Sequence, residues 1–163
     1  MALAALDATV VVRGLAGERP IRFADFHRLP GETPERDNAL GRGDLIVSIE
    51  VPACAEGRAS HYLKIRDRQS YEFALVSAAA AVAADGRRIR SVRLALGGVA
   101  HKPWRLTAVE VALRGASLDD IDALRSAIAG SFSEVRPLAH NAFKVELAQR
   151  VALRALQTAG TRA

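Results

Sequence analysis

The feature that most constrains the fold is a tight turn, Asp85-Gly86, between two long apolar runs. A two-residue hairpin turn needs positive φ angles at its centre, and Asp-Gly meets this need at little steric cost. The preceding run, Ala74 to Ala84, is almost entirely small and apolar, which by itself fits a buried strand or a helix. The turn and the run that follows favour a strand, whose alanines let a covering helix approach closely.

The second run, residues 88–96, alternates apolar residues with arginine and alanine, as a half-buried strand does. The alternation slips by one residue near Ser91. Because the side-chain period of a strand is two, the slip predicts a β-bulge or a late strand start.

The elements around this hairpin predict an α+β domain. Residues 62–68 alternate as a third strand, and helices are expected at 105–113, 117–130 and 142–159. The second helix is expected to begin at Ser117 as its N-cap, followed by acidic residues that suit the helix dipole. We therefore predict a three-stranded antiparallel sheet that is covered on one face by about three helices.

Residues 1–55 are different, because they contain three expected strands (7–13, 20–23 and 44–51) and no helix of useful length. Such a set buries too little surface for independent stability. We therefore expect 1–55 to be the C-terminal remnant of a larger β-rich domain whose N-terminal part is missing from this sequence. The small residues of 53–60 mark the boundary, and 56–163 form the second domain.

Composition argues against several classes of function. No apolar run exceeds the twelve residues of 73–84, so no membrane insertion is expected. One cysteine and four scattered histidines predict neither a disulfide framework nor a metal site. The net charge is +5, but the arginines are scattered singly and do not form a stripe interleaved with aromatic residues. We therefore expect no nucleic-acid binding.

Three cations, Lys64, Arg66 and Arg68, alternate along the expected strand that contains Tyr62, and so would line one of its faces. Two interpretations fit this pattern. A charged, solvent-facing edge strand prevents edge-to-edge pairing. Alternatively, the cations form a positive wall against a negatively charged cofactor.

The other polar candidates are weaker. We interpret His101 and Cys54 as structural or surface residues, because neither lies in a catalytic or metal-binding spacing. Gly97-Gly98 is interpreted as a tight turn, since neither a helix nor a Lys-Ser/Thr pair follows it as in a phosphate loop. Trp104 is predicted to pack in the core. No residue is assigned a catalytic role.

Three motifs resemble one family: Tyr62-x-Lys64-x-Arg66-x-Arg68, Phe73-Ala74-Leu75-Val76-Ser77-Ala78-Ala79, and Leu96-Gly97-Gly98-Val99-Ala100-x-x-Pro103-Trp104-Arg105. The family is the FAD-binding, or medium, subunit of the molybdenum hydroxylases, which include xanthine dehydrogenases, carbon monoxide dehydrogenases and aldehyde oxidoreductases. The start, Leu6 to Val10, resembles the closing part of the family's FAD-binding domain, and the rest resembles its C-terminal domain. The segment Phe26 to Pro34 most resembles the aldehyde oxidoreductase branch.

The resemblance implies FAD as the cofactor. It also favours the interpretation in which the cations of the expected strand bind a cofactor. By this resemblance Lys64 and the Leu45-Ile46 pair approach FAD, and Tyr62 is a weaker candidate near the isoalloxazine ring. The family's glycine-rich pyrophosphate loops lie N-terminal to the part that this chain resembles. The cysteine-bearing iron–sulfur insertion of the aldehyde oxidoreductase branch has no counterpart in this chain. We therefore expect FAD in the complete subunit, and no tight binding by this chain alone.

The resemblance also implies a role in electron transfer. Electrons would pass from iron–sulfur clusters through FAD to an acceptor, with a molybdenum-cofactor subunit and an iron–sulfur subunit as partners, and this chain would not be active alone. The complex would be cytoplasmic, or periplasmic if it is exported. The alternative is a non-enzymatic module that docks on partner subunits without binding flavin.

Overall fold

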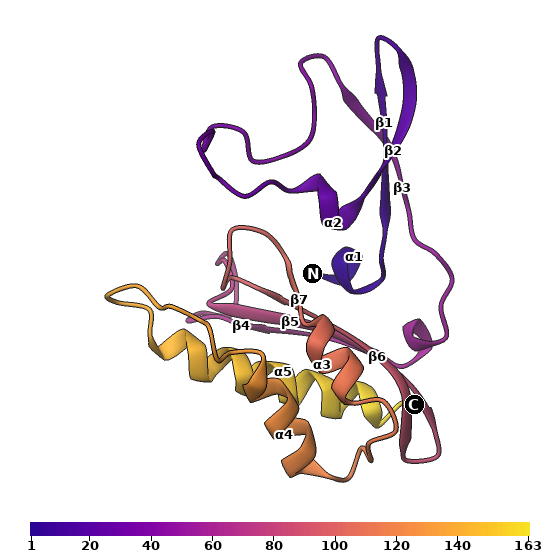
Figure 1. Ribbon diagram of the computed structural model, residues 1–163, viewed down its shortest axis with the longest axis vertical. Coiled ribbons are helices and arrows are strands. Elements are labelled where there is room, and N and C mark those ends of the chain that lie inside the picture. Colours follow the sequence, from indigo (N-terminus) through magenta and orange to yellow (C-terminus); the bar gives the residue numbers. More distant parts are fainter.

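The computed structural model describes all 163 residues and contains two antiparallel sheets (Figure 1). The smaller sheet has the order β2-β1-β3, with β1 at Thr9–Gly14, β2 at Gly17–Arg22 and β3 at Leu45–Glu50. The larger has the order β4-β5-β6-β7, with β4 at Ser60–Ile65, β5 at Val76–Asp85, β6 at Arg88–Gly97 and β7 at Trp104–Arg105. The predicted α+β class is confirmed.

The Asp-Gly hairpin is the centre of the larger sheet, as predicted. Strands β5 and β6 pair from Ser77 opposite Gly97 to Asp85 opposite Arg88, and Gly86 adopts the positive φ of +57° that the turn needs. The register shifts where Ala83 faces Ser91 but Ala84 faces Ile89, so Arg90 is the extra residue of a bulge. The slip in the sequence pattern therefore marks a real β-bulge.

The larger sheet has a short fourth strand that the pattern did not reveal. Trp104 of β7 pairs with Leu96, and the Leu106 amide donates to the Leu94 carbonyl at 2.9 Å. This ladder occupies residues that were predicted to begin a helix. Helix α3 therefore begins only at Thr107 and ends at Ala112.

Helices α3, α4 (Ile121–Gly130) and α5 (Phe143–Gly160) cover one face of this sheet (Figure 1). Together with β5 and β6 they enclose a core of 21 buried residues. Alternate β5 residues, among them Ala78, Ala80 and Val82, face this core. Small side chains on both α5 and β5 allow the two layers to approach closely. None of the helices combines the length and the apolar character that a membrane crossing requires.

Helix α4 begins three residues later than predicted. Asp120 is its N-cap, and the carboxylate accepts from the Ala123 amide at 3.0 Å. The Ser117 hydroxyl instead accepts from the Asp119 amide within the preceding turn. Both side chains are good acceptors for free helix amides, so the sequence pattern could not choose between them.

The smaller sheet has little core of its own, since only Val10, Val12 and Phe26 are buried there. Phe26 ends α2 (Phe23–Phe26), a single helical turn. Every residue of β3 is exposed. This sparse packing agrees with the expectation that these strands bury too little surface for independent stability.

Candidate functional site

Helix α1 (Ala2–Ala5) lies between the two sheets, on the face of the larger sheet opposite α3–α5 (Figure 1). Ala5 packs against Ala79 of β5 and Ala95 of β6, and all three are buried. Gly97 extends this contact, because a Cβ there would lie only 2.6 Å from the Met1 Sδ. Small residues therefore hold the N-terminal segment against the larger sheet.

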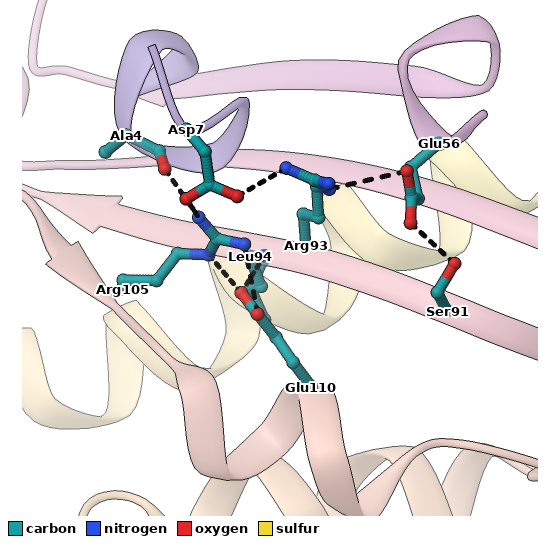
Figure 2. Close-up of polar contacts among 8 residues, drawn as sticks. All are labelled: Ala4, Asp7, Glu56, Ser91, Arg93, Leu94, Arg105 and Glu110. Carbon is teal, nitrogen blue, oxygen red and sulfur yellow. Dashed lines mark hydrogen bonds and ion pairs between the residues drawn. The ribbon is translucent and has the colours of Figure 1, made fainter. Parts of the chain in front are cut away.

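A cluster of charged groups continues the contact beside α1 (Figure 2). Oδ2 of Asp7 accepts from Nη1 of Arg93 at 2.5 Å, and Oδ1 accepts from Nη1 of Arg105 at 2.8 Å. Asp7 has a φ of +52°, a left-handed conformation that Asp and Asn adopt more readily than other non-glycine residues. One carboxylate thus ties the segment leading into β1 to both β6 and β7.

Arg105 is fully engaged in this cluster. Its Nη2 donates to Oε2 of Glu110 at 3.1 Å, and its Nη1 donates to the Ala4 carbonyl at 2.6 Å. Glu110 also accepts from the Leu94 amide at 2.8 Å. Burial lowers the pKa of Arg105, but the hydrogen bond and charge of Glu110, helped by Asp7, outweigh it and raise that pKa. The guanidinium therefore stays charged.

Glu56 completes the cluster from the short 3-10 helix η1 (Glu56–Arg58). Its carboxylate accepts from the Ser91 hydroxyl at 2.6 Å and lies 3.4 Å from Nε of Arg93. Burial raises the pKa of Glu56, but the Ser91 hydrogen bond and the Arg93 charge contribute to a larger opposing effect, so this pKa is lowered. Glu56 is thus ionised at neutral pH and fixes the connection between the two sheets.

No sequence pattern identified this cluster. Asp7 and Arg93 are 86 residues apart, and each is one of many single charges in the sequence. The available signal was Arg93 itself, which shares a strand face with the buried Ala95. An arginine on a covered sheet face needs a carboxylate partner, although the pattern does not say which one.

Of the predicted cofactor residues, Leu45 and Ile46 lie at the start of β3, with 68% and 49% of their surface exposed. Ile46 pairs with Val12, whereas Leu45 pairs with Arg13. Neighbouring strand residues point to opposite faces. Only one of these two side chains can therefore meet a ligand on a given side of the sheet.

In the sequence, Leu45, Val47, Ile49 and Val51 stand at every second position, which predicts that they share one face of β3. This prediction is wrong. The register shifts around Val47, so that Ile46 faces Val12 and Ile49 faces Val10. Residues directly opposite each other share a face, so the bulge brings Ile46 and Ile49 onto the side of the small buried cluster.

Tyr62 and Lys64 both lie on β4, the edge strand of the larger sheet. Leu63 and Ile65 pack on the helical side, so Tyr62 and Lys64 point to the other side, where α1 lies. Tyr62 lines a cavity of about 160 Å³ beside α1, and Lys64 lines a separate hollow of about 270 Å³. Neither is lined by Leu45 or Ile46.

The prediction that three cations share one strand face is wrong, because β4 ends at Ile65. Arg66 and Arg68 belong to the loop that follows. There the Arg68 guanidinium donates to the Tyr71 carbonyl at 2.5 Å, and the Arg68 amide donates to the Glu72 carboxylate at 2.9 Å. These bonds fold the chain into a turn that a regular strand would not allow.

The predictions for Trp104 and the Gly97-Gly98 pair agree with the structure. Trp104 packs against the helical core, with its ring edge-on to Phe132 at 5.0 Å between centroids. Gly98 has a φ of +78°, and a Cβ there would lie 2.7 Å from the Leu75 carbonyl oxygen. The pair is therefore a tight turn that leads into β7, not a phosphate loop before a helix.

Solved structures of two oxidoreductases share this fold. Carbon monoxide dehydrogenase from Hydrogenophaga pseudoflava is similar with a TM-score of 0.84 and 28% identity over 99% of this chain and 56% of that one. Quinoline 2-oxidoreductase from Pseudomonas putida 86 is similar with a TM-score of 0.83 and 24% identity over 98% of this chain and 54% of that one. At that identity, the second likeness shows the fold alone.

The family model for the CO dehydrogenase flavoprotein C-terminal domain matches residues 61–159, and the model for the FAD binding domain in molybdopterin dehydrogenase matches residues 1–54. The chain belongs to this flavoprotein family, the FAD-binding medium subunits of the molybdenum hydroxylases, as the sequence motifs predicted.

Two curated relatives are similar to this chain over most of its length. The aldehyde oxidoreductase FAD-binding subunit PaoB of Escherichia coli (strain K12) is 43% identical over 92% of this chain and 44% of its own length. The glyceraldehyde dehydrogenase medium chain of Sulfolobus acidocaldarius is 33% identical over 83% of this chain and 45% of its own length. The chain therefore spans less than half the length of these relatives.

Proposed function

We propose that the chain is part of the FAD-binding, electron-transferring subunit of a molybdenum-containing hydroxylase that oxidises aldehydes. Electrons would pass from iron–sulfur clusters through FAD to an acceptor, and the partners would be a molybdenum-cofactor subunit and an iron–sulfur subunit. The observation that carries this proposal is the 43% identity, over 92% of the chain, to a relative named as an aldehyde oxidoreductase FAD-binding subunit. The chain would act only within this complex.

Two units would divide this role, residues 1–55 as part of the FAD-binding domain and residues 56–163 as the C-terminal domain. The separate sheets and the short connection through η1 support this division. The charged cluster around Asp7 would then fix the orientation of one unit on the other, and with it the distance between two walls of a flavin site.

Exposed residues of the two units supply groups that suit opposite walls of an isoalloxazine site. A flavin ring needs flat apolar cover and a nearby cation or hydrogen-bond donor, which tune its electronic properties. On β3, either Ile46 or Leu45 can offer exposed apolar surface, and on β4 Tyr62 is half exposed on the sheet face towards α1. When bound, FAD supplies the transfer of electrons between one-electron and two-electron carriers.

Lys64 is the cation of the proposed wall on β4. Its ammonium donates to the Glu72 carbonyl at 2.7 Å, which orients the group and leaves two N–H donors free. A lysine held in this way can donate to a ring oxygen and stabilise negative charge there. Phosphate binding is not part of this proposal, since Gly97-Gly98 leads into β7 and not into a helix.

The first test is purification of the complex from its own host through an affinity tag on this chain. We expect stoichiometric FAD, molybdenum and iron to co-purify, which absorbance and metal analysis would measure. A complex that contains the chain but no flavin would contradict the cofactor assignment. Flavin without molybdenum would contradict the enzyme class.

The second test is Lys64→Ala in that complex, with Arg154→Ala as the matched control. Arg154 is an exposed cation on α5 that makes no ion pair. Loss of Lys64 should lower flavin content or slow flavin reoxidation by about tenfold. A tenfold change corresponds to the free energy of about one charge-assisted hydrogen bond. Arg154→Ala should change neither. Equal behaviour of the two variants would refute the role of Lys64.

A docking module without flavin is the second candidate, because the loop after β4 presents two aromatic side chains. Tyr71 and Phe73 are 96% and 95% exposed, and this much free aromatic surface is typical of an interface. In that case Tyr71→Ser and Phe73→Ser would prevent assembly with the partners, whereas Lys64→Ala would have no effect. Pull-down of the partner subunits measures the first effect and flavin content the second.

A further inference from the structure

One large cavity of the structure is separate from the residues proposed to meet flavin. It has a volume of about 520 Å³ and opens between the loop after β6, the loop before α5 and the first turns of α5. Leu45, Ile46, Tyr62 and Lys64 are not among its 14 lining residues. Cavities of this size accommodate small organic ligands.

One side of this cavity is apolar and aromatic. Trp104 and Phe132 meet edge to face, with 5.0 Å between ring centroids, and Val135 and Val145 extend the apolar surface. Aromatic walls of this kind bind a ring through offset or edge-on packing. The cavity therefore suits the apolar part of a small amphipathic molecule.

The polar lining is entirely cationic or neutral. Arg136, Lys144 and His101 line the cavity, and no carboxylate does. The Arg136 guanidinium has no hydrogen-bond or ion-pair partner in the chain, and Lys144 Nζ makes one bond, to the Gly98 carbonyl at 3.1 Å. Five guanidinium N–H groups and two ammonium N–H groups are thus free to bind an anion.

The start of helix α5 adds to this positive character. Lys144 and Val145, in the first turn of this 18-residue helix, line the cavity, as does Asn141 directly before its N-cap. Its N-cap, Ala142, supplies no side-chain hydrogen bond. The N-terminal end of a helix favours negative charge, and here it lies beside two cations.

We propose that this cavity binds a small hydrophobic carboxylate, with its ring against Trp104 and Phe132 and its carboxylate on Arg136 and Lys144. The apolar wall and the lack of any lining acid select this class over neutral or cationic ligands of the same size. The proposal does not depend on the flavin, so its test is independent of the proposed function.

Trp104 is the only tryptophan of the chain, so its fluorescence reports on the cavity directly. The full chain, shown to be folded by circular dichroism, would be titrated with 4-phenylbutyrate, and in parallel with 4-phenylbutan-1-ol and acetate. We expect a saturable fluorescence change with 4-phenylbutyrate. The alcohol lacks the charge and acetate lacks the ring, so both should bind at least about fivefold more weakly.

Variants then assign the contacts, with calorimetry as a second measurement. Arg136→Gln and Lys144→Gln should each weaken 4-phenylbutyrate binding roughly threefold to tenfold, since each removes one charge-assisted contact. Arg154→Gln, on α5 outside the cavity, is the matched control and should have no effect. Arg136 and Arg154 are both exposed, so neither substitution should disturb folding.

Three results would overturn the proposal. Equal affinity for the alcohol would show an apolar pocket without selection for an anion. No saturable signal in either fluorescence or calorimetry would show that the cavity does not bind this class. An equal loss with Arg154→Gln would show general attraction to a basic surface.

Discussion

At Asp7 a single carboxylate accepts hydrogen bonds from two arginines while its backbone holds a left-handed conformation. Asp7→Asn should keep the backbone favourable, because Asn also tolerates this region, but it removes the charge. The carboxylate is 56% exposed, so solvent screens part of the interaction, and the expected loss in unfolding free energy is about 1–2 kcal/mol. Urea unfolding measures this loss.

Asp7→Ala separates the backbone contribution from the charge. The left-handed conformation costs alanine about 1 kcal/mol more conformational free energy than it costs asparagine. Asp7→Ala should therefore be the less stable of the two variants. Asp25→Asn is the control, because its pair with Arg22 is long, at 3.8 Å, and exposed. A loss at Asp25 as large as that at Asp7 would argue that the cluster has no special role.

At the scale of elements, two glycines with positive φ differ in what surrounds them. A comparison of the two distinguishes the cost of a strained turn conformation from the cost of close packing. A Cβ added at Gly86 would have nothing within 4 Å, whereas one added at Gly98 would lie 2.7 Å from the Leu75 carbonyl oxygen. Gly86→Ala should therefore cost only the conformational penalty of about 1–2 kcal/mol. Gly98→Ala should cost about 2 kcal/mol more, because backbone must move. Thermal unfolding of both variants tests this difference, and equal costs would contradict it.

The elements that were predicted well are those whose signals are local. The β5–β6 hairpin follows from Asp85-Gly86, and its bulge follows from the slip near Ser91. Element ends were predicted less well, because they depend on contacts with distant residues. Strand β7 pairs with the free edge of β6 at Ala95 and Leu96, and beyond the end of β4 at Ile65 Arg68 bonds within its own loop.

The candidate site shows the same limit. Family motifs identified Lys64 and Tyr62, and the period of β4 placed them on one face, as the structure has them. The contacts of Asp7 with Arg93 and Arg105 join residues from three distant segments, and no local pattern encodes such a pairing. Likewise, the bulge at Val47, which places Ile46 and Ile49 on the same face of β3, arises from pairing with β1, not from the β3 sequence alone.

At the scale of the whole molecule, the two sheets differ sharply in how much they bury. The larger sheet and its helices share 21 buried core residues, whereas the smaller sheet contributes Val10 and Val12 with Phe26. Local stability follows buried contacts, so the smaller sheet should open without global unfolding. We expect amide hydrogen exchange in β1 to be at least about 100-fold faster than in β5 under native conditions.

Substitution in the charged cluster should change the rate of amide hydrogen exchange in β1. If Asp7 couples the sheets, Asp7→Asn should speed exchange in β1 by about a further tenfold, the equivalent of about 1.4 kcal/mol, and should speed exchange in β5 by no more than corresponds to the loss in unfolding free energy that urea measures. The reason is that α1 and the Asp7 contacts fix β1 to the larger sheet, while the β5 core lies on the other face. Hydrogen exchange measured by mass spectrometry on peptides from both strands checks this. Unchanged exchange in β1 would contradict the role of the cluster in coupling the two sheets.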